Sequence, residues 1–175
     1  SQTEEYLDVF DEQNQPTGVA LPRSQVHAEG LWHRTVHIYL YRQGTLGLEF
    51  LLHLRSMQKE TGPGRWDTRF GGHIKAGQSV EEGVRDELHE EIGLFEDDVK
   101  LLAESKDFHY YHLPTHLVRP NSKPVCIGQK QKWFLLSLVG SMDNIQLNKC
   151  HPPEFDGWQW VSYWYPLNQV VSFKR

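Results

Sequence analysis

Three glutamates within five residues could bind a metal ion together. Glu87, Glu90 and Glu91 lie in the run GVRDELHEEIGL, and positions i, i+3 and i+4 share one face of a helix. Like charges at that spacing repel one another, and a cation among them would offset the repulsion. Hard oxygen ligands suit Mg²⁺ or Mn²⁺, and Mg²⁺ usually bridges to substrate phosphates. A solvated acidic helix face is the alternative interpretation of the same spacing.

One amphipathic helix, residues 79–92, is expected to carry these glutamates. Apolar residues recur every four positions, at Val80, Val84, Leu88 and Ile92. Ser79 with Glu82 three residues later is typical of a capping box, and Gly93 is typical of a helix C-terminus. The three glutamates would flank the apolar stripe instead of lying inside it.

The segments around that helix are expected to form strands. Apolar patterns predict strands at 33–42, 48–56, 66–70, 99–105, 107–113, 131–139 and 157–162. The opening of the chain indicates a short strand, a turn at 14–18 and a short helix at 23–28, and PLNQVVSFK indicates a last helical turn. These elements predict an α/β (α+β) fold with a mixed β-sheet between helices, in three layers.

Length and composition indicate one globular domain over residues 1–175. No apolar run approaches the roughly 18 residues of a membrane span, and no leader pattern opens the chain. Two cysteines, Cys126 and Cys150, make no disulfide framework, so we expect a cytoplasmic protein without a membrane partner. A net charge of -5 argues against duplex DNA as a partner, although metal ions can neutralise substrate phosphates in an acidic pocket.

The run GGHIKAGQSVEEGVRDELHEEIGL, residues 71–94, resembles the Nudix box. That box is a glycine, a loop with a glutamate, and then Arg-Glu-apolar-x-Glu-Glu-x-Gly-apolar. With Gly72 as the first glycine, six positions are in register: Glu87, Leu88, Glu90, Glu91, Gly93 and Leu94. The resemblance implies a Nudix fold and a metal site made by Glu87, Glu90 and Glu91 with the carbonyl of Gly72.

Two positions depart from the box. Gln78 stands where the family has a glutamate, and Asp86 stands where it has an arginine. In the family those two side chains typically pair and brace the loop against the helix. Arg85 lies one position too early, about 100° away around a helix. We therefore expect weaker metal binding and slower turnover, with the three carboxylates retained.

Two parts of the chain resemble different Nudix groups. Residues 4–94, with LPRSQVHAEGLWHRTVHIYLY and GRWDTRFGGHIKAG, are similar to the group related to isopentenyl diphosphate isomerase, which includes hydrolases. Residues 97–175, with KPVCIGQKQKWFLLSL and PEFDGWQWVSYWYPLNQVVSFKR, are similar to the bacterial RNA pyrophosphohydrolase family. The two resemblances predict a chimera, natural or engineered. Isomerase activity is not expected, because WDTRFGG lacks the cysteine of the isomerase pattern.

The second resemblance assigns a base or an extra metal ligand to Glu154, in PEFDGW, which would otherwise be an exposed loop carboxylate. It also assigns a pocket for the first bases of RNA to Val171, Phe173 and Lys174. Core packing is the alternative for the first two of these. Arg55, in LHLRS, falls near the place where that family presents a basic residue to RNA, and Tyr111 is a further substrate-binding candidate.

The histidines give weaker indications. The run HYYHLPTH lacks zinc-finger spacing, so His109, His112 and His116 are expected to be surface or strand residues. Trp32, His33 and His37 lie at the entry to a strand. They could line a pocket or simply pack.

These motifs predict a Mg²⁺- or Mn²⁺-dependent Nudix pyrophosphohydrolase that cleaves a diphosphate linkage by water attack, with Glu91, Glu154 and Glu90 as its catalytic residues. The expected substrate is a 5′-triphosphorylated RNA or a nucleoside polyphosphate. One alternative is a hydrolase of a small nucleoside diphosphate derivative. Another is a catalytically weak or inactive Nudix scaffold, recombined or designed, which Gln78 and Asp86 favour.

Overall fold

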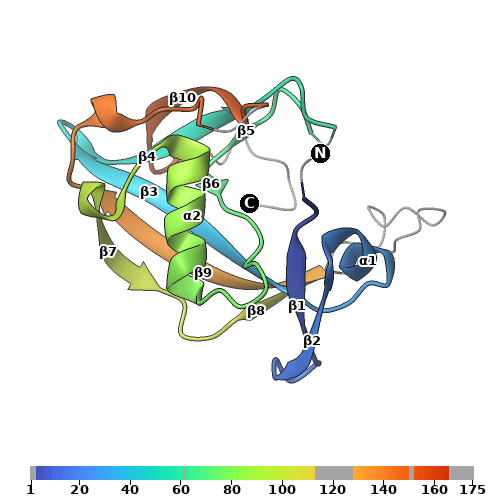
Figure 1. The fold of residues 1–175 in the computed structure, drawn as a ribbon. Helices are drawn as coiled ribbons and strands as arrows, with labels where there is room; N and C mark the ends of the chain where they lie inside the picture. The colour runs from blue at the N-terminus through green and yellow to red at the C-terminus, as the bar shows by residue number, and fades with distance from the viewer. Residues whose placement is uncertain (1–2, 61, 113–127, 150–151, 166–175) are drawn as a thin grey trace. The chain divides into compact units, whose positions relative to one another are not determined.

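The computed structural model describes residues 3–60, 62–112, 128–149 and 152–165 (Figure 1). The chain divides into two compact units. The first contains residues 1–36, 72–83 and 105–133, and the second contains residues 37–71, 84–104 and 134–175. Strands β3 (Arg34–Gly44) and β9 (Gly128–Leu138) and helix α2 (Val80–Ile92) each run from one unit into the other.

The first unit begins with an antiparallel pair, β1 (Tyr6–Phe10) and β2 (Pro16–Pro22), followed by α1 (Arg23–Ala28). Its small core joins both strands to the helix through Leu7, Val9, Val26, Leu21 and Leu31. In the same unit β8 (His109–His112) pairs with the first residues of β9.

The turn between β1 and β2 lies earlier than the sequence predicted. The Asp11 N–H donates to the Gln15 carbonyl at 2.9 Å, and the Gln15 N–H donates to the Asp11 carboxylate at 2.8 Å. Asn14 has a φ of 63°, the left-handed conformation that asparagine tolerates better than most residues. The chain is therefore already extended at Pro16, and the turn spans residues 11–15 instead of the expected 14–18.

The second unit is built on a sheet in the order β10-β4-β3-β9-β7. The strands not yet bounded are β4 (Gly47–Arg55), β5 (Trp66–Asp67), β6 (Arg69–Phe70), β7 (Val99–Glu104) and β10 (Phe155–Ser162). β4 pairs antiparallel with both β3 and β10, while β5 pairs with β4 and β6 pairs with β3. Two short 3₁₀ helices, η1 (Glu96–Asp98) and η3 (Met142–Asn144), complete the described elements.

Helix α2 has the boundaries that the sequence predicted to within one residue. The Ser79 hydroxyl accepts a hydrogen bond from the Glu82 N–H at 3.1 Å, and the Glu82 carboxylate accepts from the Ser79 N–H at 2.8 Å, so the capping box is confirmed. Gly93 ends the helix with a φ of 74°. A Cβ at Gly93 would lie 2.9 Å from the Gln146 carbonyl oxygen, so only glycine fits there.

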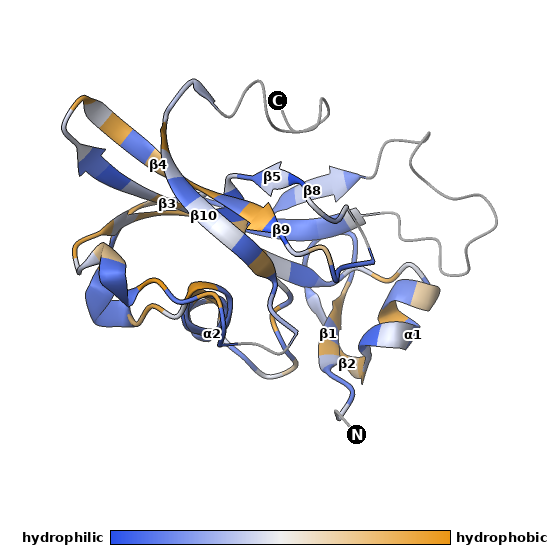
Figure 2. Ribbon diagram, turned by 90° about the horizontal axis from the view of Figure 1, so that it is seen from above, coloured by the Kyte–Doolittle hydropathy of each residue, from blue (hydrophilic) through white to orange (hydrophobic). Residues whose placement is uncertain are grey.

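The core of the second unit lies between this helix and the sheet. Leu88 and Ile92 of α2 are buried, as are the inward residues of the strands: Ile38, Leu40, Leu51, Leu52 and Phe70. In this unit α2 crosses one face of the sheet (Figure 1), and Figure 2 shows that β4 carries both apolar and polar residues. Burial of one face on each element leaves the polar side of α2 for chemistry.

A bulge at the start of β10 ties that strand to the end of β4. The register changes from Phe155 opposite Arg55 to Gly157 opposite Leu54, which leaves Asp156 as an extra residue. The Asp156 carboxylate accepts from the Met57 N–H at 2.9 Å. One side of the bulge is therefore fixed to the loop that follows β4.

The mixed α+β class expected from the sequence is confirmed by these elements. The last helical turn, expected in PLNQVVSFK, lies outside the described residues, so the third layer stays a prediction. The single domain over residues 1–175 also stays a prediction. Within the described ranges no helix has the length and apolar character of a membrane span.

Candidate active site

The three glutamates of α2 differ in exposure. Glu87 is buried, with 9% of its surface exposed, whereas Glu91 is partly buried and Glu90 is exposed. All three lie on the polar side of a helix whose opposite side carries Leu88 and Ile92 into the core. Glu87 and Glu91, one turn apart, are thus the pair held at the base of the helix's polar face.

Glu91 lies in an unusual electrostatic environment. Burial, followed by the charges of Glu87 and Glu154, raises the pKa of its carboxyl from 4.5 to about 9. Lys59 and Arg55 act against this rise. Glu154 comes from the segment before β10, and both cations come from the end of β4 and its loop. The second unit thus brings together three predicted carboxylate positions and Arg55.

Glu154 is held by those two cations. Its Oε1 forms an ion pair with the Lys59 ammonium, and its Oε2 lies 3.8 Å from the Arg55 guanidinium. The side chains of Lys59 and Glu154 are only 25% and 23% exposed. The sequence pointed to Arg55 and Glu154 and missed Lys59, whose only signal was a positive charge four residues after Arg55.

The donor set fits a hard divalent cation. Glu87, Glu91 and Glu154 offer carboxylate oxygens, the ligands that Mg²⁺ and Mn²⁺ prefer. Burial first, and then the charges of Glu87 and Glu154, raise the pKa of Glu91, and a bound cation would offset both effects. Glu87 and Glu91 would therefore hold the ion, with Glu90 at the exposed edge of the same helix and Glu154 as a base or an extra ligand.

One of the two departures from the Nudix box, Gln78, has a local role. The Gln78 side-chain oxygen accepts from the Lys75 N–H at 2.9 Å, and the Gln78 N–H donates to the Lys75 carbonyl at 3.0 Å. These two hydrogen bonds of Gln78 close the turn before α2. Arg85 is exposed and pairs with Glu96 at 3.0 Å, which agrees with its displaced position on the helix.

Five predicted site residues belong to the other compact unit or lie outside the described residues. Gly72 and Tyr111 belong to the first unit. The Gly72 carbonyl accepts from the Val36 N–H at 3.0 Å, and Tyr111 stands opposite Gln129 in the β8–β9 pair. Three further candidates lie outside the described residues: Val171, Phe173 and Lys174. The roles given to these five residues stay predictions.

Three histidines of the first unit form a second cluster that the sequence did not indicate. His27, His33 and His73 each bring one possible ligand atom within 4.8 Å of the others. The His33 Nδ1 donates to the Leu31 carbonyl at 3.0 Å, which leaves its buried Nε2 as a lone pair without a hydrogen-bond partner. Imidazoles of this kind could hold a transition-metal ion. His33, expected to line a pocket or to pack, is fully buried here.

The histidine cluster should make stability depend on pH. Burial, followed by the charges of His33 and Arg23, lowers the pKa of His27 from 6.5 to about 4. Between these two pKa values the unfolded chain binds a proton at His27 and the folded chain does not. Stability therefore falls as the pH drops from 6.5 towards 4. From pH 7 to pH 5, the free energy of unfolding measured with urea should fall by about 1 kcal/mol more in the unmodified chain than in His27→Gln. The exposed His109→Gln is the control, and equal slopes in His27→Gln and the unmodified chain would contradict the assignment.

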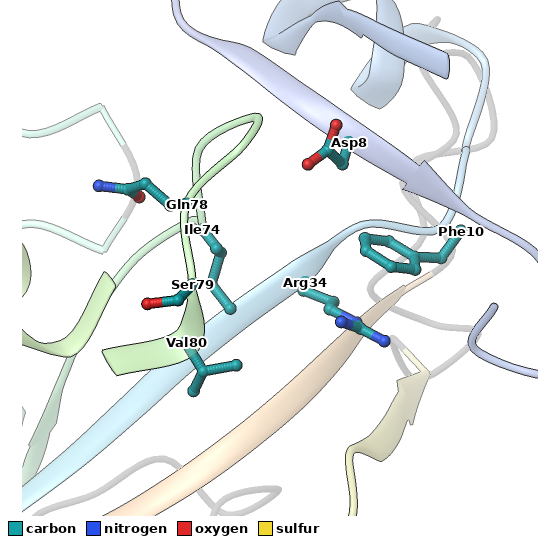
Figure 3. Close-up of a pocket in the computed structure, with 7 residues that line it drawn as sticks. All are labelled: Asp8, Phe10, Arg34, Ile74, Gln78, Ser79 and Val80. Atoms are coloured by element: carbon teal, nitrogen blue, oxygen red, sulfur yellow. The ribbon is translucent and has the colours of Figure 1, made fainter. Parts of the chain in front are cut away.

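A small pocket of the first unit, about 270 Å³, lies at the start of α2 (Figure 3). It is lined by Asp8, Phe10, Arg34, Ile74, Gln78, Ser79 and Val80. The Arg34 guanidinium lies over the rings of Phe10, at 3.8 Å, and Phe108, at 4.4 Å, and donates to Asn14. No residue of the glutamate cluster lines this pocket.

Comparison with known proteins agrees with these observations. The family model described as the NUDIX domain matches residues 31–174. The chain is 53% identical over 118 residues to the RNA pyrophosphohydrolase of Shewanella piezotolerans, covering 63% of this chain and 68% of that protein. It is 54% identical over 117 residues to the RNA pyrophosphohydrolase of Acinetobacter baylyi, covering 67% of this chain and 70% of that protein.

A solved structure shares the fold at low identity. The crystal structure of a C. elegans Ap4A hydrolase binary complex has a TM-score of 0.58 at 17% identity, covering 81% of this chain and 88% of that one. The predicted chimera stays a prediction, because none of these matches tests it. The family match, which contains the glutamate helix and Glu154, is decisive. The chain belongs to the Nudix family.

Proposed function

We propose that this Nudix protein hydrolyses a diphosphate linkage in 5′-triphosphorylated RNA or in a nucleoside polyphosphate. The observation that carries the proposal is the convergence of Glu91, Glu87 and Glu154 with two cations, Arg55 and Lys59. Carboxylates are suited to a divalent cation and to the attacking water, whereas the cations are suited to phosphate oxygens. The two relatives above are named RNA pyrophosphohydrolases, which supports RNA as the substrate.

Each group has a role in the displacement. A bound Mg²⁺ or Mn²⁺ would screen the phosphate charges and stabilise the charge that develops on the leaving group. Glu154 orients the attacking water and takes its proton while the oxygen bonds to phosphorus and the diphosphate P–O bond breaks. Glu87, Glu91 and Glu90 supply ligands, and Arg55 contacts a phosphate oxygen of the substrate. We also propose that Gly72, Tyr111, Val171, Phe173 and Lys174 keep the roles predicted above.

Phosphate release from a substrate panel tests this function. The panel contains triphosphorylated RNA, diadenosine polyphosphates, nucleoside triphosphates and nucleoside diphosphate sugars, each with Mg²⁺ or Mn²⁺. We expect kcat/KM to be at least about tenfold higher on RNA or a nucleoside polyphosphate than on the sugars.

Other outcomes of that panel point elsewhere. Preference for the diphosphate sugars would favour the small-substrate hydrolase. No phosphate release from any substrate of the panel, by a folded protein, would favour the inactive scaffold. Because the family match runs through both compact units, we propose that they form one domain. A cytoplasmic location and the lack of duplex DNA binding stay predictions.

A further inference from the structure

Both oxygens of the Glu154 carboxylate are engaged by cations of one loop. Oε1 pairs with Lys59 and Oε2 with Arg55, and the two contacts differ: the Lys59 contact is direct, whereas the Arg55 atoms lie 3.8 Å away. Lys59 is therefore the closer partner. A carboxylate meant to receive a proton from water or to bind a metal is here already occupied by an ammonium group.

The backbone places Lys59 in this position. The Ser56 N–H donates to the Glu154 carbonyl at 2.9 Å, and the Lys59 N–H donates to the Ser56 carbonyl at 3.2 Å. The Met57 N–H donates to the Asp156 carboxylate at 2.9 Å. The loop is thus tied to both sides of Glu154, so the meeting of Lys59 with that carboxylate is built into the fold.

A divalent cation and Lys59 would serve the same carboxylate. Three carboxylates, Glu87, Glu91 and Glu154, face two cations, Lys59 and Arg55, in the same field. A divalent ion that binds the carboxylates removes the need for Lys59 as their counter-ion. Lysine is a compact charge on a flexible four-carbon stem, so its ammonium can move to a new partner without movement of the backbone.

We propose that Lys59 is a positioning residue that changes partners: it holds Glu154 before the metal binds and then contacts a phosphate oxygen of the substrate. This proposal rests on the proposed function, because the second partner is the substrate of that reaction. It assigns Lys59 two opposite effects. The ammonium competes with the metal for Glu154, and it assists substrate binding once the metal is bound.

Lys59→Met should therefore shift the two affinities in opposite directions. Loss of the competing ion pair should lower the Kd for Mg²⁺ by about threefold to fivefold. Loss of a charge-assisted contact to phosphate should raise KM for the preferred substrate by about tenfold or more. A purely structural ion pair predicts the opposite for the metal, because its loss would leave Glu154 misplaced and weaken Mg²⁺ binding.

Mg²⁺ titration by calorimetry without substrate, followed by steady-state kinetics, tests the proposal. Mg²⁺ is chosen because carboxylates suit it and the three histidines do not. Lys59→Gln repeats the test with a polar side chain, and Lys59→Arg should keep the Kd for Mg²⁺ near that of the unmodified chain. Lys132→Met is the matched control, since Lys132 is partly buried like Lys59 and its ammonium donates to the Lys106 carbonyl.

The two measurements separate this proposal from the proposed function. Tighter Mg²⁺ binding with a higher KM supports the exchange of partners. Unchanged or weaker Mg²⁺ binding in both Lys59→Met and Lys59→Gln overturns it, even if the enzyme is active. Absence of turnover in every variant and in the unmodified chain would instead count against the proposed function, while the metal titration still decides whether Lys59 competes for Glu154.

Discussion

Replacing Glu91 with glutamine is expected to lower kcat on the preferred substrate by about 10²- to 10⁴-fold. Glutamine keeps the shape of the side chain and removes its negative charge, so the metal ligands lose one carboxylate while the helix keeps its packing. The charges of Glu87 and Glu154 both raise the pKa of Glu91, which places Glu91 between the other two carboxylates of the cluster. Steady-state kinetics at saturating Mg²⁺ measures the loss.

Glu104→Gln is the matched control for that experiment. Glu104 is an exposed carboxylate on β7, so its replacement removes the same charge from the same compact unit. Its kcat should stay within about twofold of the unmodified chain. Equal activity in Glu91→Gln and Glu104→Gln would rule out the assignment of the glutamate helix as the catalytic metal site.

The same Glu91→Gln substitution should stabilise the protein when metal is removed by a chelator. The folded chain holds a proton on Glu91 up to a pKa of about 9, whereas the unfolded chain releases it near 4.5. Stability therefore falls as the pH rises through that window, because the unfolded state binds fewer protons there. Glutamine does not titrate, so the variant does not lose this stability. At pH 8 its free energy of unfolding should exceed that of the unmodified chain by about 2 kcal/mol, after allowance for the partial exposure of Glu91.

Urea unfolding with chelator at pH 5 and pH 8 measures this gain. The difference between Glu91→Gln and the unmodified chain should be small at pH 5 and should grow towards pH 8. Addition of Mg²⁺ should then stabilise the unmodified chain more than the variant, since only a bound ligand raises stability by mass action. A variant that is less stable than the unmodified chain at pH 8 would refute the pKa of Glu91.

Local patterns in the sequence predicted the elements well. The helix at Arg23–Ala28 was predicted with its observed boundaries, and α2 was predicted through Ser79, Glu82 and Gly93, because caps are signals within a few residues of the helix end. The turn before β2 was predicted three residues too late, at 14–18 instead of 11–15, because Asn14 takes a left-handed φ without glycine and β2 begins before Gly18.

Residues of the candidate active site could be predicted to lie together only where they belong to one helix. Glu87, Glu90 and Glu91 share a helix, so their spacing alone indicated a common face. Lys59 meets Glu154 across 95 residues of sequence, and no local pattern marks that contact. The histidine cluster likewise joins α1, the entry to β3 and the loop before α2, three segments that only the folded first unit brings together.

The bulge at Asp156 has a consequence for how such sites change between relatives. Along a strand, the face that a side chain occupies depends on whether its position is odd or even. The extra residue at the bulge changes which face odd-numbered and even-numbered positions occupy. Glu154, before the bulge, stays opposite Ser56, whereas the residues of β10 after the bulge are shifted by one position. Loss of Asp156 would shift the alternation of side chains by one position and turn the Glu154 carboxylate to the opposite face. We therefore expect an indel at this bulge to move the proposed base, Glu154, while every glutamate in the sequence is kept.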